Sequence, residues 1–116
     1  MIVAFSVQPT GEPSDPALAR DLGEGADAAS VHDAVAAAVR IVRDSGLPTR
    51  TSAMFTEIEG EWDEVMDVVK RATAEAGRYG SRVSLVLKAD IRPGHEGELD
   101  GKIERMQAAV DRLDQD

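Results

Sequence analysis

The stretch Ala53–Met66, AMFTEIEGEWDEVM, constrains the fold more than any other part of the chain. Its first half alternates in character, as expected for a β-strand, because successive side chains of a strand point to opposite faces. One face carries Met54, Thr56 and Ile58, and the other carries Phe55, Glu57 and Glu59. Gly60 breaks the strand, and the acidic residues after it suit the first turn of a helix, where the helix dipole favours negative charge. The stretch therefore predicts a strand that leads through a glycine turn into an amphipathic helix.

The rest of the chain can be arranged around this unit. Alternating or apolar runs predict further strands at residues 2–8, 48–52 and 82–91, and apolar residues at helical spacing predict helices that begin near residues 30, 61 and 99. The resulting order, strand–helix–strand–strand–helix–strand, is that of the split βαβ motif. We therefore expect an α+β fold, a ferredoxin-like βαββαβ sandwich with a four-stranded antiparallel sheet, both crossover helices on one face and an extra C-terminal helix.

Chain length and the distribution of proline and glycine indicate one domain. A chain of 116 residues corresponds to a single domain, residues 1–116. Within it, residues 9–29 contain three prolines and three glycines and lie between a predicted strand and a predicted helix. Because long connections without structure are uncommon in compact domains, we expect this segment to be a flexible loop insertion on the surface.

Composition excludes several classes of function. The formal net charge of −9 argues against nucleic acid and anionic membrane surfaces as partners, since both require a basic surface. The absence of cysteine excludes disulfides, thiolate metal sites and a cysteine nucleophile. No apolar run approaches the roughly 20 residues that span a bilayer, and the first residues lack a basic segment typical of a signal peptide. We expect a cytoplasmic protein.

No catalytic motif stands out in the sequence. His32 and His95 lie far apart and lack the neighbours of a metal site. The sequence contains no Ser-His-Asp order, no glycine-rich phosphate loop that leads into a helix, and no paired-acid site. The sequence therefore predicts no catalytic residue, no metal and no cofactor.

Candidate ligand-binding residues surround the end of the central strand: Ser30, Met54, Thr56, Glu59 and Trp62. A hydroxyl and an acid at the end of an apolar strand, where a strand-to-helix turn can open a cleft, suit a small polar ligand. An aromatic ring beside the acid could face a cationic ring. Each residue type also has a structural role: Ser30 can cap a helix, Thr56 can bond to backbone, Glu59 can be solvated and Trp62 can anchor the core.

Two apolar surfaces predict association. Phe55 and Val86 fall on the sheet face opposite the helices, which we interpret as a subunit interface because such a patch is too apolar for water. The C-terminal helix is expected to pack through a stripe at helical spacing: Leu99, Ile103, Met106, Val110 and Leu113.

With these elements in place, the chain resembles the thiamine-binding protein family. The resemblance rests on four stretches: MIVAFSVQP, Ser30 at the start of the first helix, SGLPTRTSAMFTEIEGEWDEVMDVVKRA, and VSLVLKADIRPG followed by Lys102. Two features depart from the family pattern, since Phe55 stands where the family usually has glycine and the first loop is much longer. The resemblance implies a small homo-oligomer, a dimer or tetramer, that binds thiamine or its hydroxymethylpyrimidine part without enzymatic activity.

Three classes of function remain open at this stage. The first is a binding protein for thiamine or a related aminopyrimidine. The second is a small cofactor-free enzyme, which the fold permits by analogy alone, and the third is a structural or regulatory oligomer without a ligand. A pocket lined by Thr56 and an acid would favour the first class, an open cleft with a strongly shifted His or Asp the second, and a filled core without a pocket the third.

Overall fold

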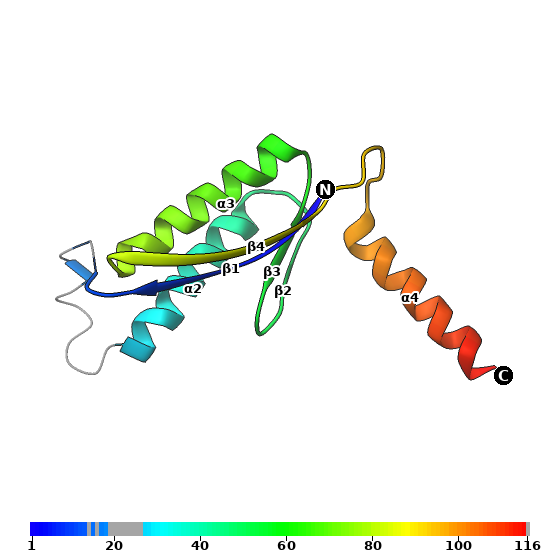
Figure 1. Cartoon of the computed structure of the whole chain (residues 1–116), viewed down its shortest axis with the longest axis horizontal. Helices are drawn as coiled ribbons and strands as arrows, with labels where there is room; N and C mark the ends of the chain where they lie inside the picture. The colour runs from blue at the N-terminus through cyan, green and yellow to red at the C-terminus, as the bar shows by residue number, and fades with distance from the viewer. Residues whose placement is uncertain (14, 16, 19–26, 116) are drawn as a thin grey trace.

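The computed structural model describes residues 1–13, 15, 17–18 and 27–115, without the side chains of residues 27–30. Its elements are β1 (Ile2–Thr10), α2 (Asp27–Asp44), β2 (Thr49–Thr51), β3 (Thr56–Glu59), α3 (Trp62–Ala76), the short 3-10 helix η1 (Gly77–Tyr79), β4 (Arg82–Asp90) and α4 (Glu98–Asp114). The strands form one antiparallel sheet in the order β2-β3-β1-β4 (Figure 1). The order of the elements and of the strands confirms the expected ferredoxin-like α+β sandwich with an added C-terminal helix.

The core lies between one face of the sheet and the helices α2 and α3. Val3 pairs with Ile58 on one side and with Ala89 on the other, so the alternation predicted from the sequence brings apolar side chains of three strands together. The helices contribute the buried residues Ala34, Ala38, Val42, Val65, Val68, Val69, Ala72 and Ala76. Many of these are small, and small side chains let the helices approach the sheet closely.

The turn from β3 into α3 forms as the sequence predicts. The backbone N–H of Gly60 donates to the carbonyl of Met1 at 3.1 Å, and the Met1 amino group donates to the Gly60 carbonyl at 3.2 Å. A Cβ at Gly60 would lie 3.1 Å from a methyl group of Val65, so a larger residue would be crowded. Asp63 and Glu64 occupy the first turn of α3. The turn therefore also fixes the start of the chain.

The expected insertion is shorter than the sequence suggests. β1 continues to Thr10, with Pro9 opposite Val83, and α2 begins at Asp27, so residues 9–10 and 27–29 belong to regular elements. Ser30 is therefore inside α2 rather than at its start, and its predicted capping position is wrong. Within the insertion, Arg78 bonds to the Asp15 carboxylate at 2.7 Å. Residues 14, 16 and 19–26 lie outside the described part of the chain.

Two aromatic residues lie away from their expected positions. Phe55 does not continue β3, because Ser52 and Phe55 close a turn in which the Phe55 N–H donates to Ser52 Oγ at 3.2 Å. The strand alternation therefore begins only at Thr56, and Phe55 is absent from the outer sheet face. Trp62 at the first position of α3 is 53% exposed and does not anchor the core. Val86 lies on the outer face as expected and is exposed.

Helix α4 does not pack along the body of its own chain. Figure 1 shows it running away from the end of the sheet to the C-terminus. Of the predicted stripe only Leu99 is buried, and Ile103, Met106, Val110 and Leu113 are between 39% and 73% exposed. The expected packing is therefore wrong within one chain, because α4 is fixed by its first turn and its axis points past the sheet. No helix among the described residues is long and apolar enough to cross a membrane.

Candidate functional site

A cleft of about 250 Å³ opens between the end of β1, the first half of α2 and the hairpin that joins β2 to β3. We call it the hairpin cleft, and its lining residues are Phe5, Ser6, Val7, Gln8, Val31, Val35, Ala38, Val39 and residues 51–56. Apolar side chains come from β1 and α2, while most of the polar groups come from the hairpin. The cleft thus lies at the helix-covered side of the sheet, where the short β3 strand leaves space.

Thr56 is the polar residue that the fold places most deeply in this cleft. It is the first residue of β3, opposite Phe5 of β1, and only 8% of it is exposed. Its hydroxyl has no hydrogen-bond partner among the described residues, whereas nearby Ser52 Oγ is engaged by Phe55. No buried polar side-chain atom among the described residues lacks a hydrogen-bond partner, so the Thr56 hydroxyl is not sealed in the core but is reached from the cleft. The cleft therefore offers an available donor and acceptor group at an otherwise apolar wall.

Among the described residues that line the hairpin cleft, none has an ionisable side chain. Its polar side chains include the hydroxyls of Thr51, Ser52 and Thr56, whereas the side chain of Gln8 belongs by strand alternation to the opposite face of the sheet; its apolar groups include Phe55 and Met54. Such a lining suits an uncharged heteroaromatic ring, because hydroxyl groups can satisfy ring nitrogens and amino groups without the desolvation cost of a charge. The acid that the sequence placed at this site is absent from the lining.

The predicted site residues divide into two groups. Met54 and Thr56 line the hairpin cleft, and Ser30 is one residue before Val31, which also lines it. The side chain of Ser30 lies outside the described structure. Trp62 instead lines a separate hollow of about 240 Å³, together with residues of the 91–96 loop. Of the predicted site residues whose side chains are described, the structure therefore brings only Met54 and Thr56 together in one cleft. The ligand-binding roles of all of them remain predictions.

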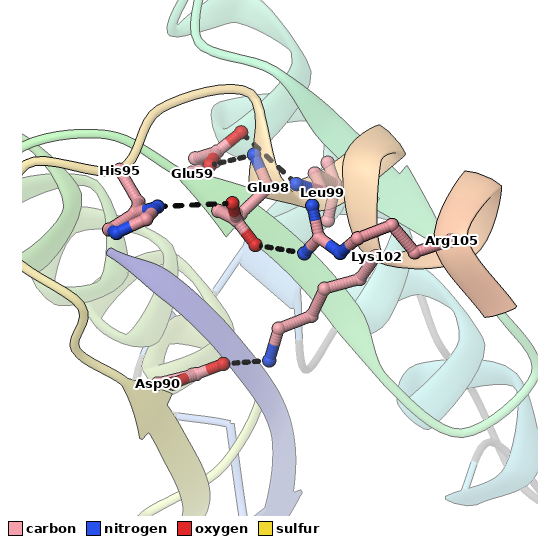
Figure 2. Close-up of polar contacts among 7 residues, drawn as sticks. All are labelled: Glu59, Asp90, His95, Glu98, Leu99, Lys102 and Arg105. Carbon is pink, nitrogen blue, oxygen red and sulfur yellow. Dashed lines mark hydrogen bonds and ion pairs between the residues drawn. The ribbon is translucent and has the colours of Figure 1, made fainter.

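Glu59 lies at a different place again, at the start of α4. Figure 2 shows its buried carboxylate accepting the backbone N–H of Glu98 at 2.7 Å and that of Leu99 at 3.3 Å. The first backbone N–H groups of a helix lack partners within the helix, and a carboxylate satisfies them and suits the helix dipole. Gly97, which precedes the helix with a φ of 67°, has no side chain to do this. Glu59 therefore caps α4 from the sheet.

Two ion pairs join α4 to the sheet: Lys102 pairs with Asp90 at the end of β4 (Figure 2), and Asp100 pairs with Arg50 of the opposite edge strand, β2. Within α4, Glu98 accepts a hydrogen bond from Arg105 at 2.6 Å. The Arg105 hydrogen bond holds the pKa of Glu98 below its usual value, although burial opposes this. The Lys102 hydrogen bond lowers the pKa of Asp90 in the same way.

Sequence reasoning missed two parts of this arrangement. It did not find the contribution of α2 to the cleft, because valine and alanine at helical spacing predict core whether or not a cavity adjoins them. It also missed the capping role of Glu59. A usable signal existed, since Gly97 supplies no side-chain cap and Glu59 is an acid in a strand that leads into the core. Among the described residues, no three His, Cys, Asp or Glu side chains form a metal site.

The fold defines the class of this protein as a ferredoxin-like sandwich with an added helix, and comparison with known proteins supplies the family. The sequence model of the thiamine-binding protein family matches residues 23–107, so the chain belongs to that family. It is 45% identical over 104 residues to UPF0045 protein Mb1933 of Mycobacterium bovis, which covers 89% of this chain and 87% of the relative.

Solved structures agree with this assignment. A protein from Bacillus cereus with the domain of unknown function DUF77 superposes with a TM-score of 0.67 at 30% identity, over 88% of this chain and 85% of that one. A Thermotoga maritima protein provisionally assigned to thiamine biosynthesis or salvage superposes with a TM-score of 0.57 at 22% identity, over 86% and 95% of the two chains. At that identity the second likeness shows the shared fold alone.

Proposed function

We propose that this protein is a non-enzymatic cytoplasmic binding protein for thiamine or a related aminopyrimidine, and that the hairpin cleft holds the pyrimidine ring. The observation that carries the proposal is the Thr56 hydroxyl, which faces the cleft without a partner in the described chain. Membership of the thiamine-binding protein family supplies the ligand class. The cleft volume of about 250 Å³ lies just below the range of about 300 Å³ and more that is typical for drug-sized ligands, which favours a single ring.

The lining also indicates how the two halves of thiamine would lie. The aminopyrimidine is uncharged and offers an amino donor and ring acceptors, which match the Thr56 hydroxyl and the hydroxyls of the hairpin residues Thr51 and Ser52. Phe55 and Val35 would contact its ring. The positively charged thiazolium has no carboxylate to face in the part of the cleft lining that the structure describes, so we place it at the solvent side. The net charge of −9 opposes a phosphate group there.

We further propose that the protein acts as a homo-oligomer, a dimer or tetramer. The support is the exposed apolar surface of Val86 and of α4, which a single chain leaves in water. The same surface supports the second candidate function, a structural oligomer without a ligand. The unpartnered hydroxyl of Thr56 in a ring-sized cleft is the observation that favours ligand binding over that alternative.

Calorimetric titration with hydroxymethylpyrimidine, thiamine and thiamine diphosphate tests the proposal. We expect the free pyrimidine and thiamine to bind and the diphosphate to bind more weakly. Thr56→Val should weaken binding by roughly fivefold, because a neutral hydrogen bond contributes about 1 kcal/mol. Thr73→Val is the matched control, since Thr73 bonds to the Val69 carbonyl on α3 and lies outside the cleft. Absence of binding by all three compounds at millimolar concentration would leave the structural oligomer as the better description.

A further inference from the structure

A second cleft, of about 460 Å³, opens where α4 leaves the end of the sheet, on the face opposite α2 and α3. We call it the α4 cleft, and its walls include Ile2 and Ala4 of β1, Glu57 of β3, Lys88 of β4, and Leu99 and Ile103 of α4. Its volume lies within the range of about 300–1,000 Å³ that small-molecule sites occupy. Among the described residues, none lines both this cleft and the hairpin cleft.

The floor of the α4 cleft is a row of side chains that crosses three strands. Ala4 of β1 lies directly opposite Glu57 of β3 on one side and Lys88 of β4 on the other. Residues that lie directly opposite each other on antiparallel strands point to the same face of the sheet. Because adjacent strands are about 4.8 Å apart, the Cα atoms of Glu57 and Lys88 are about 9.6 Å apart. The row therefore holds an acid and a base on either side of one methyl group.

Glu57 and Lys88 are the two charges of this lining that the described chain leaves available. Neither side chain makes an ion pair or a hydrogen bond among the described residues. The neighbouring charges are already engaged in two ion pairs: Arg50 with Asp100, and Lys102 with Asp90 (Figure 2). A ligand that carries both a positive and a negative group can therefore be bound at both ends without breaking an existing pair.

We propose that the α4 cleft binds a free α-amino acid with an apolar side chain. The carboxylate of Glu57 accepts hydrogen bonds from its ammonium group, and the ammonium group of Lys88 donates to its carboxylate. Charge-assisted hydrogen bonds are about 2.8 Å long, so two of them leave about 4 Å of the separation of about 9.6 Å to the ligand. Ammonium and carboxylate groups on a single carbon atom have about this reach. The proposal goes beyond the pyrimidine site and does not rest on it.

The walls of the α4 cleft select the side chain of the amino acid. Leu99 is buried and Ile103 is 41% exposed, so the first two turns of α4 present aliphatic surface to the cleft. An apolar side chain that covers this surface removes it from water. Asp90 and Glu98 also line the cleft, and their carboxylates repel an acidic side chain. The lining therefore favours a leucine-like ligand over an aspartate-like one.

Calorimetric titration of the full chain with L-leucine tests the proposal. Isoamylamine lacks the carboxylate of leucine, isocaproate lacks its ammonium group, and L-aspartate lacks its apolar side chain. We expect saturable binding of leucine, and binding of each of the other three that is weaker by roughly tenfold or more, because hydrogen bonds between charged groups are the strong ones.

Two charge-removing variants and their matched controls locate the site. Glu57→Gln and Lys88→Met should each weaken leucine binding by roughly tenfold or more. Glu104→Gln on α4 and Lys70→Met on α3 remove the same charges at exposed positions outside the cleft, and should leave leucine binding unchanged. Leucine binding that survives both Glu57→Gln and Lys88→Met overturns the proposal.

Amide shifts of ¹⁵N-labelled protein separate this site from the hairpin cleft. Leucine should shift the amides of Ala4, Glu57, Lys88 and Ile103 and leave residues 51–56 unchanged. Shifts confined to residues 51–56 overturn the α4 cleft as the site. Absence of saturable binding at tens of millimolar leucine also overturns it, including the case in which a neighbouring subunit fills the cleft. Because hydroxymethylpyrimidine is titrated separately, failure of the pyrimidine site and failure of the amino acid site are distinguishable.

Discussion

At Thr56 the sheet brings a hydroxyl group to an apolar wall without supplying a partner for it. The residue is 8% exposed, and its hydroxyl makes no hydrogen bond to the described chain. Because no buried polar side-chain atom of the described residues lacks a partner, this hydroxyl is open to the cleft, and replacing it by a methyl group breaks no hydrogen bond within the described chain. We therefore predict that Thr56→Val leaves the free energy of unfolding unchanged to within about 1 kcal/mol. Thermal and urea unfolding measure this. A clear loss of stability would mean that the hydroxyl bonds within the protein.

Trp62 provides a readout of where the ligand lies, because it is the only tryptophan in the chain. It is 53% exposed and lines the hollow beside the 91–96 loop rather than the hairpin cleft. We predict that saturation with hydroxymethylpyrimidine changes tryptophan emission little. Fluorescence titration at the concentrations used for calorimetry measures this. Strong quenching would instead favour the interpretation in which Trp62 stacks against the ligand.

Ion pairs attach α4 to the sheet, so we expect the strength of this attachment to depend on pH. The pKa values of Glu98 and Asp90 are lowered from their ordinary 4.5 and 3.8, by the Arg105 and Lys102 hydrogen bonds respectively. A carboxylate with a lowered pKa in the folded state stabilises that state above its unfolded pKa and ceases to do so as the pH falls through the folded pKa. We predict that α4 is held firmly from neutral pH to about pH 5 and loosens on further acidification. Amide exchange in α4 measures this, and Glu98→Gln should weaken the acid response.

Glu59 should matter to α4 rather than to the core. Its carboxylate accepts two backbone N–H groups of α4, and loss of a capping side chain costs about 0.5–2 kcal/mol. We predict that Glu59→Ala speeds amide exchange at Glu98 and Leu99 and leaves pyrimidine affinity unchanged. Glu57→Ala is the matched control, because Glu57 lies on the same face of β3 and makes no hydrogen bond through its side chain in the described chain. A large loss of affinity in Glu59→Ala alone would restore Glu59 as a ligand group.

At the level of elements, periodicity was a sufficient guide wherever one face is buried. Alternation around Ile58 and helical spacing around Val65 predict the sheet and α3, and Gly60 predicts the turn between them. The hairpin was misassigned because alternation continues by chance through Phe55, while the Ser52 side chain closes a turn there. The cleft could not be predicted, because a cavity depends on the distance between packed elements. The periodicity of apolar residues in the sequence does not encode that distance.

In the whole molecule, helix α4 extends away from the sheet and does not pack along it. The radius of gyration of the molecule is 17.2 Å, whereas a compact chain of this length would have about 13 Å. The longest extent is 58 Å and the shortest 20 Å, and Figure 1 shows that α4 accounts for the extension. Beyond its first turn, where Leu99 is buried and Glu59 caps the helix, α4 leaves apolar side chains in water that a partner would cover.

Deletion of α4 tests whether this helix belongs to the interface between subunits. Removing the chain after Gly97 deletes α4 but leaves the four strands, α2 and α3 intact. We predict a folded monomer whose melting temperature no longer depends on protein concentration, because association stabilises a native state by mass action. Sedimentation and concentration-dependent melting measure this. Unchanged mass per particle after truncation would show that α4 is not part of the interface.

Nuclear magnetic resonance titration tests the central claim most directly, because it locates the ligand as well as detecting it. Uniformly ¹⁵N-labelled protein is titrated with hydroxymethylpyrimidine, and amide shifts are followed along the chain. The proposed function predicts saturable shifts concentrated at residues 51–56, at Val31 and Val35 of α2 and at Gln8 of β1. Saturable shifts confined to Trp62 and the 91–96 loop, or no shifts at millimolar ligand, would contradict binding in the hairpin cleft.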